Sequence, residues 1–159
     1  MLKITVISVG LLKESYYKEA IAEYEKRMSA FCKLTNINLK EAPFDEKGGE
    51  SMIAAALEEE ADRILSQIPK NAYKIALCIE GKEQSSEQFA ELLEDISRES
   101  GECVFIIGSS HGLSDRVKRT CDLRLSFSKM TFPHRLARVM LSEALYRSLS
   151  INRGLKYHK

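Results

Sequence analysis

The chain has 159 residues, of which 44% are hydrophobic and 30% charged, and its net charge is +1. That length suits one domain, and the composition excludes a disordered chain. It also excludes a membrane protein, because no apolar stretch approaches the roughly 18 residues of a membrane span. The apolar stretch Ile4–Leu12 is interrupted by polar residues and has no small-residue cleavage site, so it is not a secretion signal. We therefore predict one cytoplasmic domain over residues 1–159.

Charge is distributed unevenly along the chain. Residues 1–101 carry 13 Lys/Arg against 19 Asp/Glu, a net −6, whereas residues 102–159 carry 11 against 4, a net +7. Clustered cations favour a polyanionic partner, because binding to phosphates releases counterions. A solvated basic helix face would produce the same count. Charge alone leaves both interpretations open.

The four cysteines have no C-x-x-C spacing and no histidine at zinc-ligand intervals; they are Cys32, Cys78, Cys103 and Cys121. We therefore predict no metal site. Two of them stand in apolar runs, where a thiol behaves as a small hydrophobic group. Reduced core cysteines are the expected state.

The first part of the chain reads as strand, helix, strand and loop. Leu2–Val9 is a β-branched run that predicts a strand buried on both faces, as in a parallel sheet. Leu34–Leu39 predicts an edge strand, and residues 43–49 a polar loop. Between the strands, one apolar stripe at helical spacing predicts a helix; it consists of Tyr17, Ile21, Tyr24 and Met28.

A second helix and a third strand follow. The run Glu58–Glu60 is expected to be solvated on this helix. Residues 73–79 predict a strand, and residues 80–82 a loop after it. The helix itself is predicted by an apolar stripe of about four turns, formed by Ile53, Leu57, Ala61, Ile64 and Ile68.

The alternation of strand and helix continues in the next part. Ser85 and Gln88 form a plausible capping box at the start of a third helix, which Gly101 is placed to end. Strands are predicted at Cys103–Ile107 and Leu123–Phe127, with a short basic helix from about Ser114 between them. Such alternation predicts an α/β fold with an open, mostly parallel sheet flanked by helices, and ligands outside the carboxyl ends of its strands.

Three loops follow predicted strands and should lie side by side, at residues 80–82, 108–113 and 128–134. The middle loop has neither G-x-G-x-x-G nor G-x-x-x-x-G-K, so nucleotide phosphates are not its obvious ligand, and an ordinary turn has the same glycine spacing. In the third loop Thr131 is expected to cap the last helix, with Pro133 in its first turn. His134 and Arg138 share one face of that helix and form the candidate site. A packing histidine and an exposed cation are the alternatives.

The last helix and the tail suggest partners. The helix is apolar over more than one stripe, which favours a homodimer. The tail Asn152–Lys159 combines cations, an imidazole and an aromatic ring, which suits contact with RNA bases and phosphates, although chain ends are usually frayed.

Taken together, several motifs resemble one known family. They are Leu125–His134 with the sequence LSFSKMTFPH, Arg138, Phe105–Gly108, Arg153-Gly154 and Tyr157–Lys159. This combination resembles the RlmH family of SPOUT methyltransferases, which methylate N3 of a pseudouridine in large-subunit (23S) ribosomal RNA. The likeness spans the whole chain, including Lys3–Val6 and Tyr24–Arg27.

The resemblance implies a C-terminal trefoil knot, an exception to the usual absence of threaded chains. It also implies a homodimer that binds S-adenosylmethionine in the knot and acts on the assembled ribosome. This chain has Ser109 where the family often has a second glycine, and His111 where it often has asparagine. The cofactor residues implied by the motifs are Leu77, Gly108, Phe127, Ser128, Lys129, Met130, Thr131 and Phe132.

Methyl transfer to the protonated imide N3 of pseudouridine needs a base, or a cation that stabilises the anion. His134 and His158 are the candidate bases, and Arg138 the candidate anion stabiliser or phosphate clamp. Tyr157 is assigned to stacking on or orienting the RNA base, and Arg153 and Lys156 are assigned to contacts with RNA phosphates. Two alternatives are a noncatalytic ribosome-binding or assembly factor and a small-molecule methyltransferase.

Overall fold

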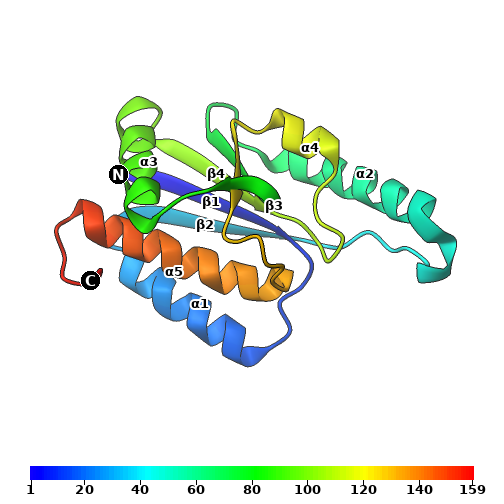
Figure 1. Ribbon diagram of the computed structural model, residues 1–159, viewed down its shortest axis with the longest axis horizontal. Coiled ribbons are helices and arrows are strands. Elements are labelled where there is room, and N and C mark those ends of the chain that lie inside the picture. Colours follow the sequence, from blue (N-terminus) through cyan, green and yellow to red (C-terminus); the bar gives the residue numbers. More distant parts are fainter.

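A computed structural model describes residues 1–159 as one parallel sheet with helices on both faces (Figure 1). The strand order is β2-β1-β4-β3-β5, and every neighbouring pair is parallel. The strands are β1 (Leu2–Val9), β2 (Cys32–Leu39), β3 (Tyr73–Glu83), β4 (Glu102–Ile107) and β5 (Leu123–Ser126). The helices are α1 (Ser15–Met28), the short 3-10 helix η1 (Glu46–Gly48), α2 (Gly49–Gln67), α3 (Ser86–Glu99), α4 (Asp115–Thr120) and α5 (His134–Asn152). The predicted α/β class and parallel sheet are confirmed, with β2 at an edge as expected.

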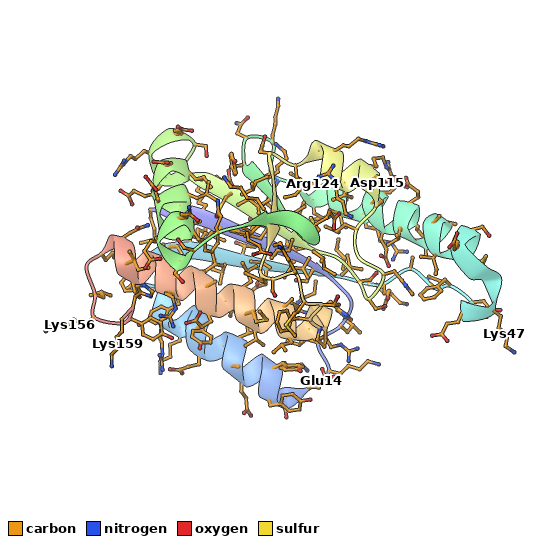
Figure 2. The ribbon with its side chains drawn as sticks, in the orientation of Figure 1. Glu14, Lys47, Asp115, Arg124, Lys156 and Lys159 are labelled. Atoms are coloured by element: carbon orange, nitrogen blue, oxygen red, sulfur yellow. The ribbon has the colours of Figure 1, made fainter.

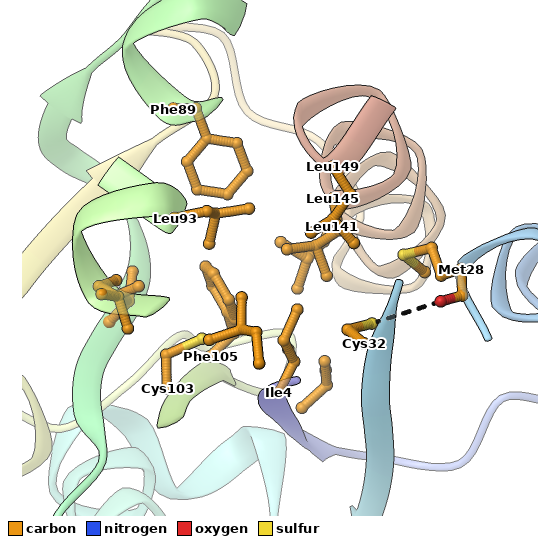
Figure 3. Packing of buried hydrophobic residues seen from close by; sticks show 14 of the residues in the cluster. Ile4, Met28, Cys32, Phe89, Leu93, Cys103, Phe105, Leu141, Leu145 and Leu149 are labelled. Atoms are coloured by element: carbon orange, nitrogen blue, oxygen red, sulfur yellow. Dashed lines mark hydrogen bonds between the residues drawn. The ribbon is translucent and has the colours of Figure 1, made fainter. Parts of the chain in front are cut away.

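The apolar core is divided between the two faces of the sheet. Ile4 and Val6 of β1 pack toward the side covered by α1, α3 and α5, where leucines of α5 meet Phe89 and Leu93 of α3 (Figure 3). Ile7 and Val9 belong to the cluster on the other side, which includes residues of α2 and α4. Because successive side chains of a strand point to opposite faces, a strand in this position has to be apolar throughout. This is the physical basis of the continuous apolar pattern in β1.

Helix ends follow the local sequence signals. The Ser85 hydroxyl accepts a hydrogen bond from the Gln88 amide at 3.1 Å, and the Gln88 side chain accepts one from the Ser85 amide at 2.9 Å. This confirms the predicted capping box of α3. Gly101 follows the helix with φ +70°, and the Ser114 hydroxyl caps α4. The ends of these helices are therefore readable from their own residues.

Three local predictions are wrong. Glu60, the last of the three glutamates expected to be solvated, is buried. Residues 80–82 are not a loop but the continuation of β3, which pairs with β5 again after an irregularity, through Lys82 and Leu125. Gly81 permits this close passage, because a Cβ there would lie 2.6 Å from the Leu125 carbonyl carbon. Helix α5 begins at His134, so Thr131 does not cap it and Pro133 lies just before it rather than in its first turn. Residues 127–133 instead form a non-helical loop between β5 and α5.

The cysteines are free, as expected, and Cys32 and Cys103 are buried. Burial raises the pKa of the Cys32 thiol to about 11 and that of the Cys103 thiol to about 12, so both remain protonated at neutral pH. No helix has the length and apolar character needed to cross a membrane. The trefoil knot stays a prediction.

Candidate functional site at the carboxyl edge of the sheet

A cavity of about 760 Å³ lies at the carboxyl ends of the strands. Leu77 of β3, Ile107 at the end of β4 and Leu125 of β5 line it together with the loops that follow β4 and β5, and with the first turn of α5. The carboxyl edge is where open parallel sheets bind ligands, because the loops after neighbouring strands meet there. Its volume falls in the range of small-molecule and cofactor pockets, about 300–1,000 Å³. This is the cavity in which the predicted loops converge.

One wall is the tight loop Gly108–Gly112. The Gly112 amide donates to the Ser109 carbonyl at 2.9 Å, and Gly112 has φ +82°. A Cβ at Gly108 would collide with the Gly112 carbonyl group. Glycine is required at position 108 because the loop folds back on itself at this point.

The facing wall is the loop of residues 127–133. The Ser126 hydroxyl donates to the Ser128 carbonyl at 2.9 Å, and the Met130 amide donates to the Ser128 hydroxyl at 3.0 Å. Met130 is 72% exposed and Phe132 36% exposed at the mouth of the cavity. Hydrogen bonds to serines therefore hold the backbone of this loop, while the apolar side chains of Met130 and Phe132 remain exposed.

The structure gathers most of the residues that we assigned to the cofactor. Lys129 is not among the lining residues. That any of them binds S-adenosylmethionine stays a prediction. The assigned residues that line the cavity are Leu77, Gly108, Phe127, Ser128, Met130, Thr131 and Phe132.

His134 lines the same cavity from the first turn of α5 and is half-buried. Its ring packs against Gly10, since a Cβ built on that glycine would lie 3.4 Å from Nε2. Burial lowers the pKa of His134, and the neighbouring Arg135 guanidinium lowers it further. The imidazole is therefore neutral at neutral pH and can accept a proton. Sequence reasoning missed Gly10, although a glycine that directly follows a buried strand was a readable signal.

Arg138 follows one turn later and is 8% exposed, so the alternative of an exposed cation is wrong. Its Nη2 donates to the Asn38 side-chain carbonyl of β2 at 2.7 Å. Burial lowers the pKa of Arg138, but an arginine remains charged in proteins. Because Asn38 is a neutral partner, it does not neutralise the positive charge of Arg138, and this charge can attract an anion nearby. Arg138 is not one of the cavity-lining residues.

The tail docks on the opposite half of α5. The Tyr157 hydroxyl donates to Glu143 Oε1 at 3.1 Å, and the Arg147 guanidinium lies 4.8 Å from the Tyr157 ring centroid. Nε2 of His158 is 2.8 Å from Glu87 Oε1, and its Nδ1 is 3.1 Å from Arg147 Nη1. Burial, and secondarily Glu143, raise the pKa of Tyr157 to about 12. These contacts hold the tail on its own chain.

The predicted catalytic residues therefore fall into two groups. His134 and Arg138 occupy the first two turns of α5, whereas the tail contacts Glu143 and Arg147, about 14 Å and 20 Å beyond His134 at 1.5 Å per residue. Figure 2 shows Lys156 and Lys159 at the tail end of the molecule, away from Glu14, whose carboxylate accepts a 2.8 Å hydrogen bond from Arg135. Arg153 packs over the Phe31 ring at 4.9 Å, and Lys156 is exposed. One chain does not bring the two groups together.

No group of three or more His, Cys, Asp or Glu side chains is arranged to hold a metal ion. The structure is thus a parallel α/β protein with a cavity at the carboxyl edge of its sheet. Two loops and the start of the last helix form the walls of this cavity. A family model described as "Predicted SPOUT methyltransferase" matches residues 2–158. The chain therefore belongs to the SPOUT methyltransferase family, which confirms the resemblance.

Relatives in several organisms carry one name, ribosomal RNA large subunit methyltransferase H. The protein from Caldicellulosiruptor bescii is 48% identical over 98% of this chain and 99% of its own length. Those from Bacillus cytotoxicus and Clostridium acetobutylicum are 45% and 44% identical over 99% of this chain and their whole length. The similarity thus covers the cavity, α5 and the tail alike.

Proposed function

We propose that this protein uses S-adenosylmethionine to methylate N3 of a pseudouridine in large-subunit ribosomal RNA, acting in the cytoplasm as a homodimer on the assembled ribosome. The observation that carries the proposal is a neutral histidine, His134, on the wall of a 760 Å³ cavity in a SPOUT methyltransferase. The names of the relatives support ribosomal RNA as the substrate.

The cavity fits the methyl donor in size and in the chemistry of its walls. Leu77, Ile107 and Leu125 offer an apolar floor for the adenine ring, and the loops offer backbone amides and carbonyls at the rim. S-adenosylmethionine supplies, when bound, a methyl group on a positively charged sulfur.

The protein's own chemical task is to handle the N3 proton. Pseudouridine N3 carries a proton near neutral pH. Two histidines line the cavity, His111 and His134, and we assign acceptance of the proton to His134, which is half-buried at the start of α5. Arg138, one turn away, contributes positive charge that favours the developing anion. In-line transfer also requires that the two reactants be held together and shielded from water, which the loop of residues 127–133 performs.

A homodimer resolves the separation between His134 and the tail. Within one chain Tyr157 contacts Glu143 and His158 contacts Arg147, about 14 Å and 20 Å beyond His134 along α5. Their proposed roles therefore require the tail of a second copy. Leu136, Val139, Met140 and Ala144 of α5 are only partly buried in one chain, which leaves apolar surface for a partner.

The cations of the basic last third also support RNA as the partner. Arg116, Lys118 and Arg135 are paired with carboxylates from the acidic part of the chain. Other cations make no ion pair and remain available for phosphates; they are Arg119, Arg124, Lys129, Arg153, Lys156 and Lys159. The unpaired set includes Arg153 and Lys156, to which we assign phosphate contacts.

The test is mass mapping of ribosomal RNA from cells with and without the protein, followed by methylation of the deficient ribosomes in vitro. We expect one pseudouridine to gain 14 Da, roughly the mass of a CH₂ unit, only when protein and S-adenosylmethionine are both present. Ribosome binding without methyl incorporation would identify a noncatalytic factor instead. Methylation of small molecules but not of ribosomes would identify a metabolite methyltransferase.

A further inference from the structure

Glu60 of α2 is a buried carboxylate outside the cavity lining. It is 3% exposed, although it ends a run of three glutamates that the sequence predicted to be solvated. Its Oε1 accepts a hydrogen bond from the Ser109 hydroxyl at 2.9 Å, and its Oε2 accepts one from the Ala42 amide at 3.0 Å. Burial of a carboxylate is costly unless both oxygens are satisfied, and here both are. Burial also raises the pKa of Glu60, an effect that these two hydrogen bonds oppose.

The Ala42 contact belongs to a short segment, residues 41–44, that we call the strap. It follows β2 and lies against the loop after β4 at two further points. Glu41 Oε1 accepts a hydrogen bond from the Ser110 hydroxyl at 3.4 Å, and the Phe44 ring meets the His111 ring edge-on with centroids 4.5 Å apart. Each of the three residues between Gly108 and Gly112 therefore has a partner in the strap or on α2.

The contact with Ser109 is the buried one among these three. Ser110 and His111 are exposed, and the Ser110 hydrogen bond is long, whereas Ser109 is 5% exposed. A hydrogen bond to a buried carboxylate is stronger than one between exposed neutral groups, and its loss leaves an acceptor without a donor. Apart from the turn between Ser109 and Gly112, this is the main restraint on the loop.

We infer that Glu60 is a positioning residue for the methyl donor, because it holds Ser109 and so keeps the cavity-lining loop Gly108–Gly112 in its binding shape. The inference rests on the proposed function. Glu60 does not line the cavity, so it acts through Ser109, which does. The Ser109 hydroxyl is thus the link between this carboxylate and the cavity wall.

The experiment is calorimetric titration of the full-length protein with S-adenosylmethionine. We expect S109A to weaken the affinity by roughly threefold to tenfold and E60A by about tenfold, because each removes one side of a buried charge-assisted hydrogen bond. E60Q should stay within about twofold of wild type, since its carbonyl can accept from Ala42 while its amide donates to the Ser109 oxygen.

E59A is the matched control, because Glu59 is the adjacent glutamate, is exposed, and pairs only with Arg63 on its own helix. It should bind the donor like wild type. In steady-state methylation, S109A should raise the KM for S-adenosylmethionine with little change in kcat, a separation that general destabilisation would not produce. Amide hydrogen exchange should also become faster in residues 109–113 of S109A than in the control.

Unchanged donor affinity in S109A, or an equal loss in E60Q and E60A, would overturn the inference. If E60A fails to fold, S109A and E60Q decide the question. Absence of donor binding in the wild-type protein would refute the proposed function and this inference together, whereas wild-type binding with unaffected variants would refute the inference alone.

Discussion

A histidine and an arginine lie together at each end of α5, but in different surroundings, and at the far end the histidine comes from the tail. His134 and Arg138 at the start are covered by protein, and burial is the largest cause of the lowered pKa of both. Arg147 and His158 at the other end are bound to carboxylates, and the Glu143 carboxylate raises the pKa of Arg147. Burial therefore keeps His134 neutral at the start of α5, whereas ion pairs hold the tail at the other end of the helix. Ion pairs of exposed groups are weakened by salt, but burial is not.

H134A should have the largest effect, because it removes the neutral imidazole at the start of α5. We expect methylation of deficient ribosomes to fall by about 100-fold or more, the lower range for loss of a general base. Donor affinity measured by calorimetry should change much less. A variant that loses only donor affinity would show that His134 is a binding residue and not the base.

G108A should damage the cavity end by steric collision. A Cβ at this position meets the Gly112 carbonyl, so the loop has to move, and we expect donor affinity to fall by more than about tenfold with a stability loss of about 1–3 kcal/mol. The control is G101A, which has φ +70° but no atom within 4 Å of a new Cβ. It should cost about 1 kcal/mol from backbone strain and leave donor affinity intact. Equal donor affinity in both variants would argue against the loop as a binding wall.

Removal of residues 153–159 tests the tail end. We expect methylation to fall by about tenfold, the loss of one base-stacking contact, while donor affinity stays unchanged because no tail residue lines the cavity. Chemical denaturation should show a stability loss of at least about 1 kcal/mol, the cost of the Tyr157 hydrogen bond alone. Full activity of the shortened chain would remove Tyr157 and His158 from the site.

Y157F makes a smaller change at the same place. Loss of the hydroxyl hydrogen bond to Glu143 should cost about 1 kcal/mol. The raised pKa means that this stabilisation is complete below the ordinary tyrosine pKa and is lost as pH rises toward 12. Ultraviolet titration should show one tyrosine that ionises near pH 12 in wild type and is missing in Y157F. Its persistence in the variant would mean that the tail is not docked as described.

R135A should have the smallest effect, and it tests how much Arg135 contributes to the lowered pKa of His134. Arg135 is the main charged neighbour that lowers the pKa of His134, so its removal should raise that pKa. NMR titration of the histidine ring protons measures the change. Because the folded-state pKa lies below the unfolded value, wild type should lose stability as pH falls below about 6.5, and R135A should lose less from this source. An unchanged His134 titration would show that burial acts alone.

The distribution of charge along the chain differs from its distribution in the folded protein. The acidic and basic parts of the chain partly neutralise each other in the fold, since Arg116 meets Glu58 and Asp62, and Lys118 meets Glu80. Arg124 and Asp115 lie near α4, whereas Lys156 and Lys159 lie at the tail (Figure 2). The count along the chain therefore overstates the charge available to RNA and does not say where it lies.

Most elements of the fold, and the faces that they bury, can be predicted from the amino-acid sequence. Continuous apolar runs predicted buried parallel strands, the Ser85–Gln88 pair predicted a helix start, and the motifs of residues 125–138 pointed to the family and to the loops that wall the cavity. These signals are local, because helix caps and strand faces depend on residues a few positions apart.

Only the tertiary structure decided which polar groups are buried and which residues meet. Glu60 looks like its exposed neighbours in the sequence, but Ser109 and Ala42 make its burial favourable. Arg138 is covered because β2 brings Asn38 to it, and residues 80–82 extend β3 because that strand pairs again with the end of β5 beyond an irregularity. The cost of burying a charge or extending a strand depends on partners far away in the chain, and no local pattern records them.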